Sequence, residues 1–176
     1  ARERVYDLLG QRDEQARDLD ALEALTEVFC DTQREAEVAL RRAHYAENTR
    51  DYPAAIAAAQ QAIRLARMTR DIHGEAAGYL AWGRALFYQG DYREANRQLQ
   101  QALDRSEAFP QVHADTLRSL GMAADDQNEA RDYFRQALHI HRKIGDRRGE
   151  WATLYNLSAL FLEQENCTQA LKYGER

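Results

Sequence analysis

The sequence predicts an all-α fold, an α-α superhelix in which helical hairpins stack into a solenoid. The first observation behind this prediction is an internal repeat, whose similar stretches open at Ala55, Ala95, Ala130 and Ala170, separated by 40, 35 and 40 residues. The second is composition, since 176 residues include only 2 prolines and 9 glycines, and Ala, Leu, Glu, Gln and Arg fill the stretches between them. Such a composition favours helix, and such a period is typical of repeats that each form one hairpin.

A third observation is that a helix start precedes each alanine of the repeat by four residues. The expected N-cap residues are Asp51, Asp91, Asp126 and Asn166. Their side chains can accept hydrogen bonds from the first free amides of a helix. A capping-box partner follows three residues later in three copies, at Glu94, Glu129 and Gln169. In the remaining copy Pro53 stands in the first turn, where a missing N–H is harmless.

Residues 1–31 fit the repeat poorly, and we expect N-terminal helices that form a degenerate repeat or a cap. A short helix is indicated before Gly10 by Val5, Leu8 and Leu9. A longer helix should begin near Asp13, because apolar residues then recur at helical spacing, at Leu19, Leu22, Leu25 and Val28/Phe29.

Residues 32–176 are expected to hold four units, about 32–70, 71–109, 110–145 and 146–176, stacked around a single continuous core. The second helix of a unit should bury its repeated alanines together with Leu99, Leu103, Phe134 and Leu138. The first helix carries a large apolar residue next to Gly83, Gly121 or Ser158, where the two helices of a hairpin should cross. We expect Trp82 in the core and Trp151 between repeats.

The third unit is shorter than its neighbours. From Gly83 to Ala95 the distance is 12 residues, but from Gly121 to Ala130 it is 9. Three residues are nearly one helical turn, so the first helix of this unit should lose its last turn, end near Asp125 and leave a notch in one rim of the solenoid. The notch is either a tolerated deletion or specific to a partner.

These patterns resemble the tetratricopeptide repeat (TPR) family over roughly residues 32–176. The connectors Asp71–Glu75 and Asp146–Glu150 share an Asp-x-x-Gly-Glu pattern, which looks like the longer TPR arrays of bacterial STAND-class signalling ATPases and related regulators. The resemblance implies a protein- or peptide-binding scaffold module from a larger cytoplasmic signalling protein. Because the last unit stops before its Gln-Ala-Leu element, we expect a fragment that self-associates through this truncated repeat.

The same resemblance implies that partners lie on the concave surface, which the first helices line. The candidate partner-binding residues are Arg41, His44, Arg84, Phe87, Tyr88, Arg118, Tyr155 and Asn156, with Met122 beside them. Three arginines recurring on one surface would make a positive channel suited to carboxylates or an acidic peptide. The alternative is that each is solvated or paired with a nearby acid, here Glu37, Glu47 or Asp115. Of the family's two-lysine, two-asparagine carboxylate clamp, Asn156 alone has a matching type, which disfavours a receptor for chaperone tails.

Other functions find little support in the sequence. A net charge of -5 and a pI near 5.6 argue against a general nucleic-acid binder, which would need a basic stripe, and no apolar run is long enough to cross a membrane. There is no phosphate-binding glycine loop and no nucleophile–base pattern, so we expect no cofactor and no enzyme. We interpret His139 and His141 as part of a cationic helix end and a solvated turn, and not as metal ligands. A small-molecule sensing arm of a STAND-type regulator, and a purely structural spacer, stay open as alternatives.

Overall fold

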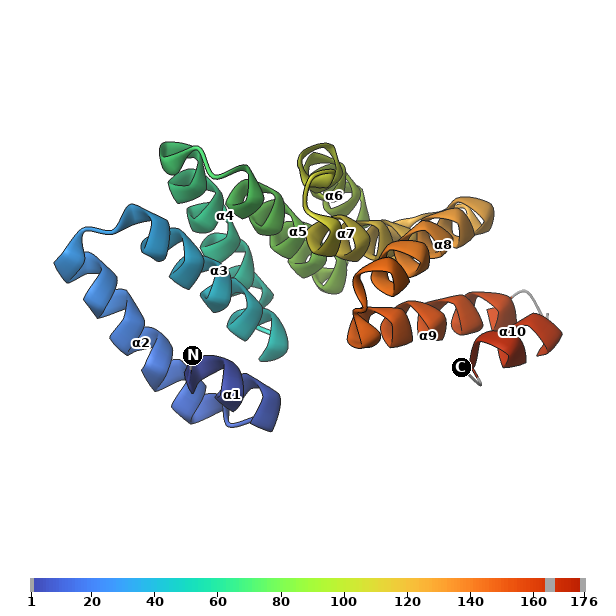
Figure 1. Cartoon of the computed structure of the whole chain (residues 1–176), viewed down its shortest axis with the longest axis horizontal. Coiled ribbons are helices and arrows are strands. Elements are labelled where there is room, and N and C mark those ends of the chain that lie inside the picture. Colours follow the sequence, from blue (N-terminus) through green and yellow to red (C-terminus); the bar gives the residue numbers. More distant parts are fainter. Residues whose placement is uncertain (1, 164–166, 175–176) are drawn as a thin grey trace.

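In the computed structural model, successive helices are joined by short connections and form an arch (Figure 1). The structure describes residues 2–163 and 167–174, and these contain no strand. The helices are α1 (Arg2–Leu9), α2 (Arg12–Phe29), α3 (Thr32–Asn48), α4 (Tyr52–Thr69), α5 (Ile72–Gln89), α6 (Tyr92–Ser106), α7 (Pro110–Ala123), α8 (Gln127–Ile144), α9 (Arg147–Glu163) and α10 (Cys167–Gly174). In this part of the chain, no helix is long and apolar enough to span a bilayer.

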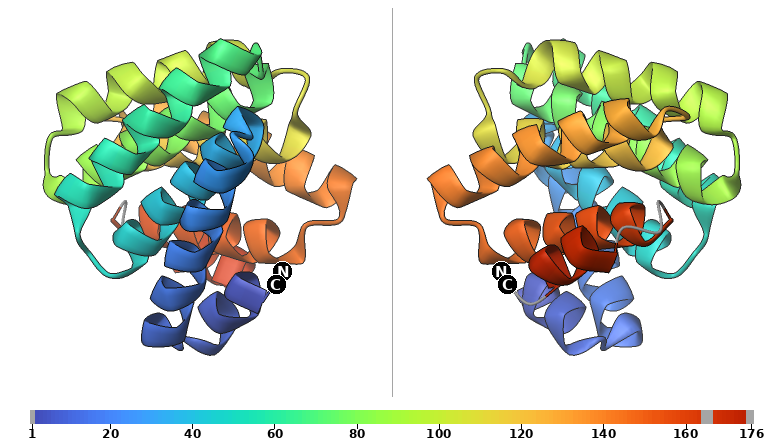
Figure 2. Two further views of the ribbon diagram at one scale, coloured as in Figure 1. Left: turned by 90° about the vertical axis from the view of Figure 1, so that its left-hand side faces the viewer. Right: turned by 90° about the vertical axis from the view of Figure 1, so that its right-hand side faces the viewer.

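The helices lie in two layers. Each helix packs against the next one in the chain, and α3, α5, α7 and α9 also contact one another in that order. These four form the inner layer, whereas α4, α6, α8 and α10 lie outside it. Views along the length of the arch show the helices winding around a common axis (Figure 2). The chain is therefore an α-α superhelix, as the sequence predicts.

The expected helix starts are confirmed for three of the second helices. The carboxylates of Asp51, Asp91 and Asp126 accept hydrogen bonds from the backbone amides three residues ahead, at 3.1, 3.2 and 2.9 Å respectively. Asn166, the fourth expected cap, lies outside the described residues. Because these side chains satisfy amides that have no partner within the helix, each of these second helices begins at the same point of its repeat.

The repeated alanines are buried where the two helices of a hairpin meet. Ala55, Ala95, Ala130 and Ala170 are all at most 4% exposed. Opposite them the first helix has no room for a side chain: a Cβ on Gly83 would lie 2.7 Å from Leu99, and one on Gly121 would lie 2.6 Å from Phe134. Small residues on one helix thus receive large residues from the other, as expected.

Buried apolar residues follow the stack of helices as two large and two small clusters. One cluster of buried apolar residues, which includes Leu99, joins α4, α5, α6 and α7, and a second, which includes Phe134, joins α8, α9 and α10. Two smaller clusters consist of alanines from α3, α4 and α5. The α7–α8 hairpin links the two large clusters, since Tyr133 of α8 packs against the first and Met122 of α7 against the second.

The predicted shortening of the third unit is confirmed. Helix α7 has 14 residues, whereas α5 has 18 and α9 has 17, and it ends two residues before Asp125. A rim cavity of about 930 Å³ lies beside its end and is lined by residues such as Tyr92, Arg97 and Asp125. The lost turn therefore leaves the notch that the spacing predicts.

The N-terminal helices form where expected, but part of their apolar surface stays uncovered. Gly10 has a φ of +69° and separates α1 from α2. Leu19 is fully buried, whereas Phe29 is 73% exposed. Of the two tryptophans, Trp82 packs against the main core as expected. The expectation that Trp151 lies between repeats is wrong, because it is 66% exposed.

The two Asp-x-x-Gly-Glu connectors are built alike. In each, the Glu pairs with an Arg eight residues earlier, Glu75 with Arg67 at 3.3 Å and Glu150 with Arg142 at 2.7 Å. The Gly lets the new helix approach the end of the preceding one. A Cβ on Gly149 would lie 2.3 Å from the ring of His141. The interpretation of this histidine as part of a solvated turn is therefore wrong, since it is completely buried.

Candidate binding groove on the inner helices

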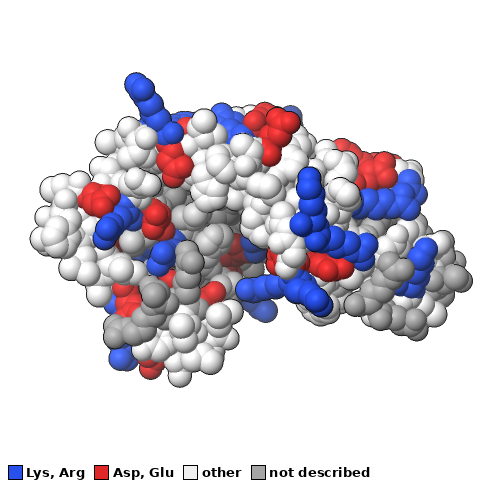
Figure 3. Space-filling model, in the orientation of Figure 1, with Lys and Arg blue, Asp and Glu red and all other residues white. Residues whose placement is uncertain are grey.

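Three cavities follow the inner surface of the arch, and we call them the N-terminal, central and C-terminal cavities. The central cavity, about 340 Å³, is lined by residues of α1, α3, α5, α7 and α9: Asp7, His44, Glu47, Asn48, Arg84, Gln111, Asp115, Arg118, Asp146, Arg148, Gly149 and Ala152. Helices from all four repeats thus converge on one hollow. In Figure 3 the face between the two arms is hollowed, and acidic and basic side chains lie together beside the hollow.

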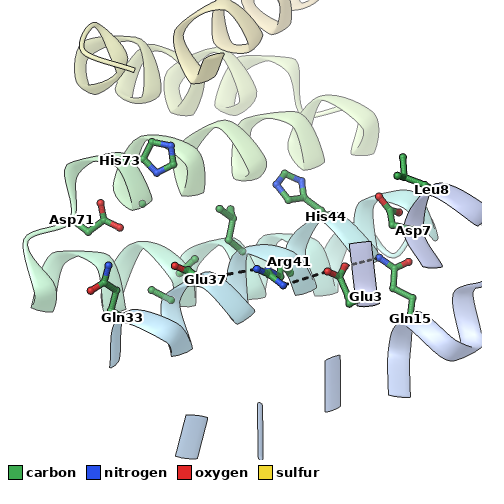
Figure 4. Close-up of a pocket in the computed structure, with 14 residues that line it drawn as sticks. Glu3, Asp7, Leu8, Gln15, Gln33, Glu37, Arg41, His44, Asp71 and His73 are labelled. Atoms are coloured by element: carbon green, nitrogen blue, oxygen red, sulfur yellow. Dashed lines mark hydrogen bonds and ion pairs between the residues drawn. The ribbon is translucent and has the colours of Figure 1, made fainter. Parts of the chain in front are cut away.

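The N-terminal cavity, about 670 Å³, lies between α1, α3 and the start of α5. A row of polar side chains forms one wall (Figure 4). Gln15 donates a hydrogen bond of 3.0 Å to Glu3, and the other carboxylate oxygen of Glu3 lies 3.5 Å from Arg41. Arg41 also faces Glu37 at 3.9 Å. Because Glu3 and Gln15 are 4% and 2% exposed, this row fixes α1 against α3 away from bulk water.

Helix α1 closes the N-terminal end of the groove. Asp7 accepts hydrogen bonds from Arg12 at 2.5 Å and from Asn48 at 3.0 Å, so it holds α1 to both α2 and α3. Sequence reasoning did not find Glu3 or Asp7, because they lie before the repeats and no period indicates where α1 folds back. The acid that contacts Arg41 most closely is thus supplied by the chain itself.

Two of the three arginines of the central cavity, Arg84 and Arg118, are paired with acids. Arg84 donates a hydrogen bond of 2.5 Å to Glu47, and Arg118 lies 3.7 Å from Asp115. These are the pairings that the alternative interpretation names. The described lining includes four carboxylates and three guanidinium groups. The cavity therefore offers alternating charges, and not the positive channel that the arginines alone would make.

Arg118 is buried but only partly satisfied by its partners. Only 14% of its side chain is exposed, and its Nε atom has no hydrogen-bond partner among the described residues. Burial lowers the pKa of Arg118, and repulsion from Arg84 adds to this effect. Its guanidinium stays charged at physiological pH, so a partner that brings an acceptor to it would relieve an unfavourable desolvation.

His44 lies between the N-terminal and central cavities and lines both. Although 45% of its side chain is accessible, the surrounding protein displaces bulk water, and this desolvation, together with the charge of Arg84, lowers its pKa from 6.5 to about 4. The ring is therefore neutral at physiological pH, and it can both donate and accept a hydrogen bond.

This shift predicts a contribution of His44 to acid sensitivity. Between pH 6.5 and 4 the unfolded chain binds a proton at this site that the folded chain does not, so the stability of the fold falls as the pH is lowered through this window. In the His44→Gln variant, the free energy of unfolding should therefore fall less steeply between pH 6.5 and pH 4. Urea unfolding at several pH values measures it, and His139→Gln, at an exposed position, is the control. A decline as steep in His44→Gln as in the wild type would contradict the assignment.

The C-terminal cavity, about 350 Å³, contains two further candidates, Phe87 and Asn156. The last two of the predicted partner-binding residues, Tyr88 and Tyr155, lie outside these cavities. Tyr88 is 44% exposed and stacks on Tyr52 with ring centroids 6.1 Å apart. Tyr155 is 63% exposed and stacks on Trp151 at 5.9 Å. Neither lines any of the three cavities, so both present aromatic surface beside the groove.

Comparison with known proteins supports the fold and one repeat directly. Residues 79–108, which span most of α5 and α6, match the family model described as "Tetratricopeptide repeat". No curated protein sequence matches the chain.

Solved structures are similar over nearly the whole chain. The apo form of RapI is 16% identical with a TM-score of 0.79, covering 98% of this chain and 65% of its own. A Rap protein complexed with Competence and Sporulation Factor is 15% identical with a TM-score of 0.87, covering 98% of this chain and 51% of its own. BtubC from P. vanneervenii is 18% identical with a TM-score of 0.75, covering 96% and 71%. The chain thus spans between half and two thirds of the Rap structures. It shares their helical superhelix, and its α5–α6 hairpin carries the tetratricopeptide signature.

Proposed function

We propose that this chain is a protein- or peptide-binding scaffold module that holds its partner in the groove along α3, α5, α7 and α9. The observation that carries this proposal is the convergence of all four inner helices, and α1, on the central cavity. A partner lying across it would meet side chains from every repeat. The Arg118 Nε and Asn156 Nδ2 atoms, buried without hydrogen-bond partners in the described structure, are suited to acceptors such as main-chain carbonyls.

The similar structures support the same function by analogy. The Rap protein of highest TM-score among those above was solved in complex with Competence and Sporulation Factor. A superhelix of this kind therefore binds another molecule in at least one relative in fold. Since paired charges line the groove here, we propose a partner that presents polar groups of both kinds, and an acidic partner finds no specific support in the central cavity.

We further propose that this chain, a cap of residues 1–31 followed by four repeat units, is a non-enzymatic part of a larger cytoplasmic signalling or regulatory protein. The two Asp-x-x-Gly-Glu connectors support this context, because STAND-class regulators are the proteins whose arrays they resemble. A small-molecule sensing arm is the alternative. It would be favoured by an enclosed apolar pocket with a few converging polar groups, whereas the central cavity is lined mainly by charged and polar side chains.

Blocking the central cavity tests the proposed function. Ala152 lies on α9, is half-buried and lines the cavity, so Ala152→Trp should fill the space and abolish binding of peptides that the wild-type chain selects from a random displayed library. Gln136→Trp places the same side chain at an exposed position of the outer helix α8 and should bind like the wild type.

Calorimetric titration with the selected peptides measures both variants. Equal binding by Ala152→Trp and the wild type, or failure of the wild-type chain to select any peptide, would refute the proposal that the groove binds the partner.

A further inference from the structure

The C-terminal cavity lies at the end of the shortened helix α7. Helix α7 ends at Ala123, and Ala124 follows with an extended backbone, at a ψ of 135°. The chain thus leaves the inner layer while α5 and α9 continue on either side. The cavity beside this end of α7 is lined by Phe87, Gly121, Met122, Ala124, Asp125, Gln127, Ala130, Phe134, Asn156, Ala159, Leu160 and Glu163.

The interior of this cavity is apolar. Phe134 and Leu160, 4% and 7% exposed, belong to the second core cluster. Phe87, Met122 and Ala159 are partly buried around them. The cavity thus reaches residues of the second core cluster.

The polar atoms of the cavity are few and specific. Asn156 lines the cavity, and its side-chain amide nitrogen is buried with no hydrogen-bond partner in the described chain. The exposed carboxylates of Asp125 and Glu163 lie at the cavity edge, and no basic residue is found among the described lining. Arg118, whose Nη1 lies 3.6 Å from the sulfur of Met122, is paired with Asp115. The charge of the edge is therefore negative.

We propose that this cavity binds one large aliphatic or aromatic side chain of a peptide segment in which a Lys or Arg stands next to that residue. The apolar side chain enters the gap left by α7, Asn156 donates a hydrogen bond to a main-chain carbonyl of the segment, and the neighbouring cation faces Asp125 and Glu163. A cavity of about 350 Å³ lies at the small end of ligand sites, which suits a single side chain and not a whole cofactor. This proposal rests on the proposed function and specifies the partner.

The two methionines of the chain allow a direct test in the wild-type protein. Met122 lines the cavity, whereas Met68, on α4, is 74% exposed. With the methionine methyl groups labelled with 13C, NMR titration with selected peptides should shift the Met122 signal and leave that of Met68 unchanged. The selected peptides should share a large apolar residue beside Lys or Arg, and replacing that residue with Ala should weaken binding roughly ten- to hundredfold.

A variant gives the reciprocal measurement. Ala159→Phe should fill the cavity and weaken binding of the same peptides to a similar degree, while peptides that carry Ala at the apolar position should bind this variant and the wild type alike. Gln136→Phe, on the outer surface, is the matched control, and circular dichroism verifies that both variants fold. If Ala159→Phe does not fold, the Met122 titration of the wild-type protein still shows whether the peptides enter the cavity.

Three results would overturn the proposal. In the first, Ala152→Trp blocks binding of the selected peptides, but these peptides leave the Met122 signal of the wild-type protein unchanged. The proposed function of the groove would then stand, and only the proposal for the C-terminal cavity would be refuted. Another is an equal Met122 shift with a single capped leucine at the same concentration, which indicates a small-molecule site. The third is a Met122 shift with protein concentration alone, which indicates contact with a second copy of the chain.

Discussion

Replacing Leu99 with Ala is expected to lower the free energy of unfolding by about 2–5 kcal/mol. Leu99 is fully buried in the main cluster, and its Cγ lies 2.7 Å from the point where Gly83 would carry a Cβ. The glycine backbone cannot move into the vacated space without displacing α5, which also packs on α4 and α7. The truncation therefore loses both apolar burial and contacts on several sides.

Urea denaturation followed by circular dichroism measures this loss. Leu8→Ala, at a position 76% exposed, is the matched control and should change stability by less than about 0.5 kcal/mol. Similar midpoints for the two variants would mean that the crossing of α5 and α6 is looser than the structure shows.

The second large effect is expected for Gly149→Ala. The added Cβ would lie 2.3 Å from the His141 ring and 2.2 Å from a carboxylate oxygen of Asp146. The ring is enclosed on all sides, being 0% exposed, so it has no free space to enter. Overpacking of this kind typically costs about 1–3 kcal/mol, and here it also disturbs the 2.9 Å contact between His141 and Asp146.

A double substitution tests this explanation. In the matching connector, Ala66 stands opposite Gly74 in the place that His141 takes opposite Gly149. His141→Ala should therefore make room for the methyl group that Gly149→Ala adds, and the double variant should be destabilised less than the two single changes added together. Thermal unfolding of all four proteins gives the coupling energy. Strict additivity would show that the glycine is needed for a reason other than the histidine.

The regular part of the fold could be predicted because it depends on local sequence. An aspartate before α4, α6 and α8 caps each of these helices through its own side chain, and a small alanine at the crossing point lets two helices approach closely. The end of α7 followed from counting residues between Gly121 and Ala130. Such features repeat, so each copy supports the others.

Contacts between distant parts of the chain could not be predicted in this way. Glu3 reaches Arg41 because α1 folds back across α3, which no period encodes. The prediction for Trp151 failed because the sequence shows only that this residue is large and apolar. Pairing of Arg84 with Glu47 was foreseen only as an alternative, since a sequence cannot rank the rotamers of long charged side chains.

The uneven packing between successive repeats affects how the molecule unfolds. In stacked repeats, stability is a sum of units and of the contacts between neighbours, and cooperativity fails first where those contacts are fewest. Helix α4 packs more extensively on α5 than α6 does on α7 or α8 on α9. Among the four repeat units, the junctions on either side of the α7–α8 hairpin are therefore where the stack should open first, and a partner that bridges them would fasten the repeats into one cooperative unit.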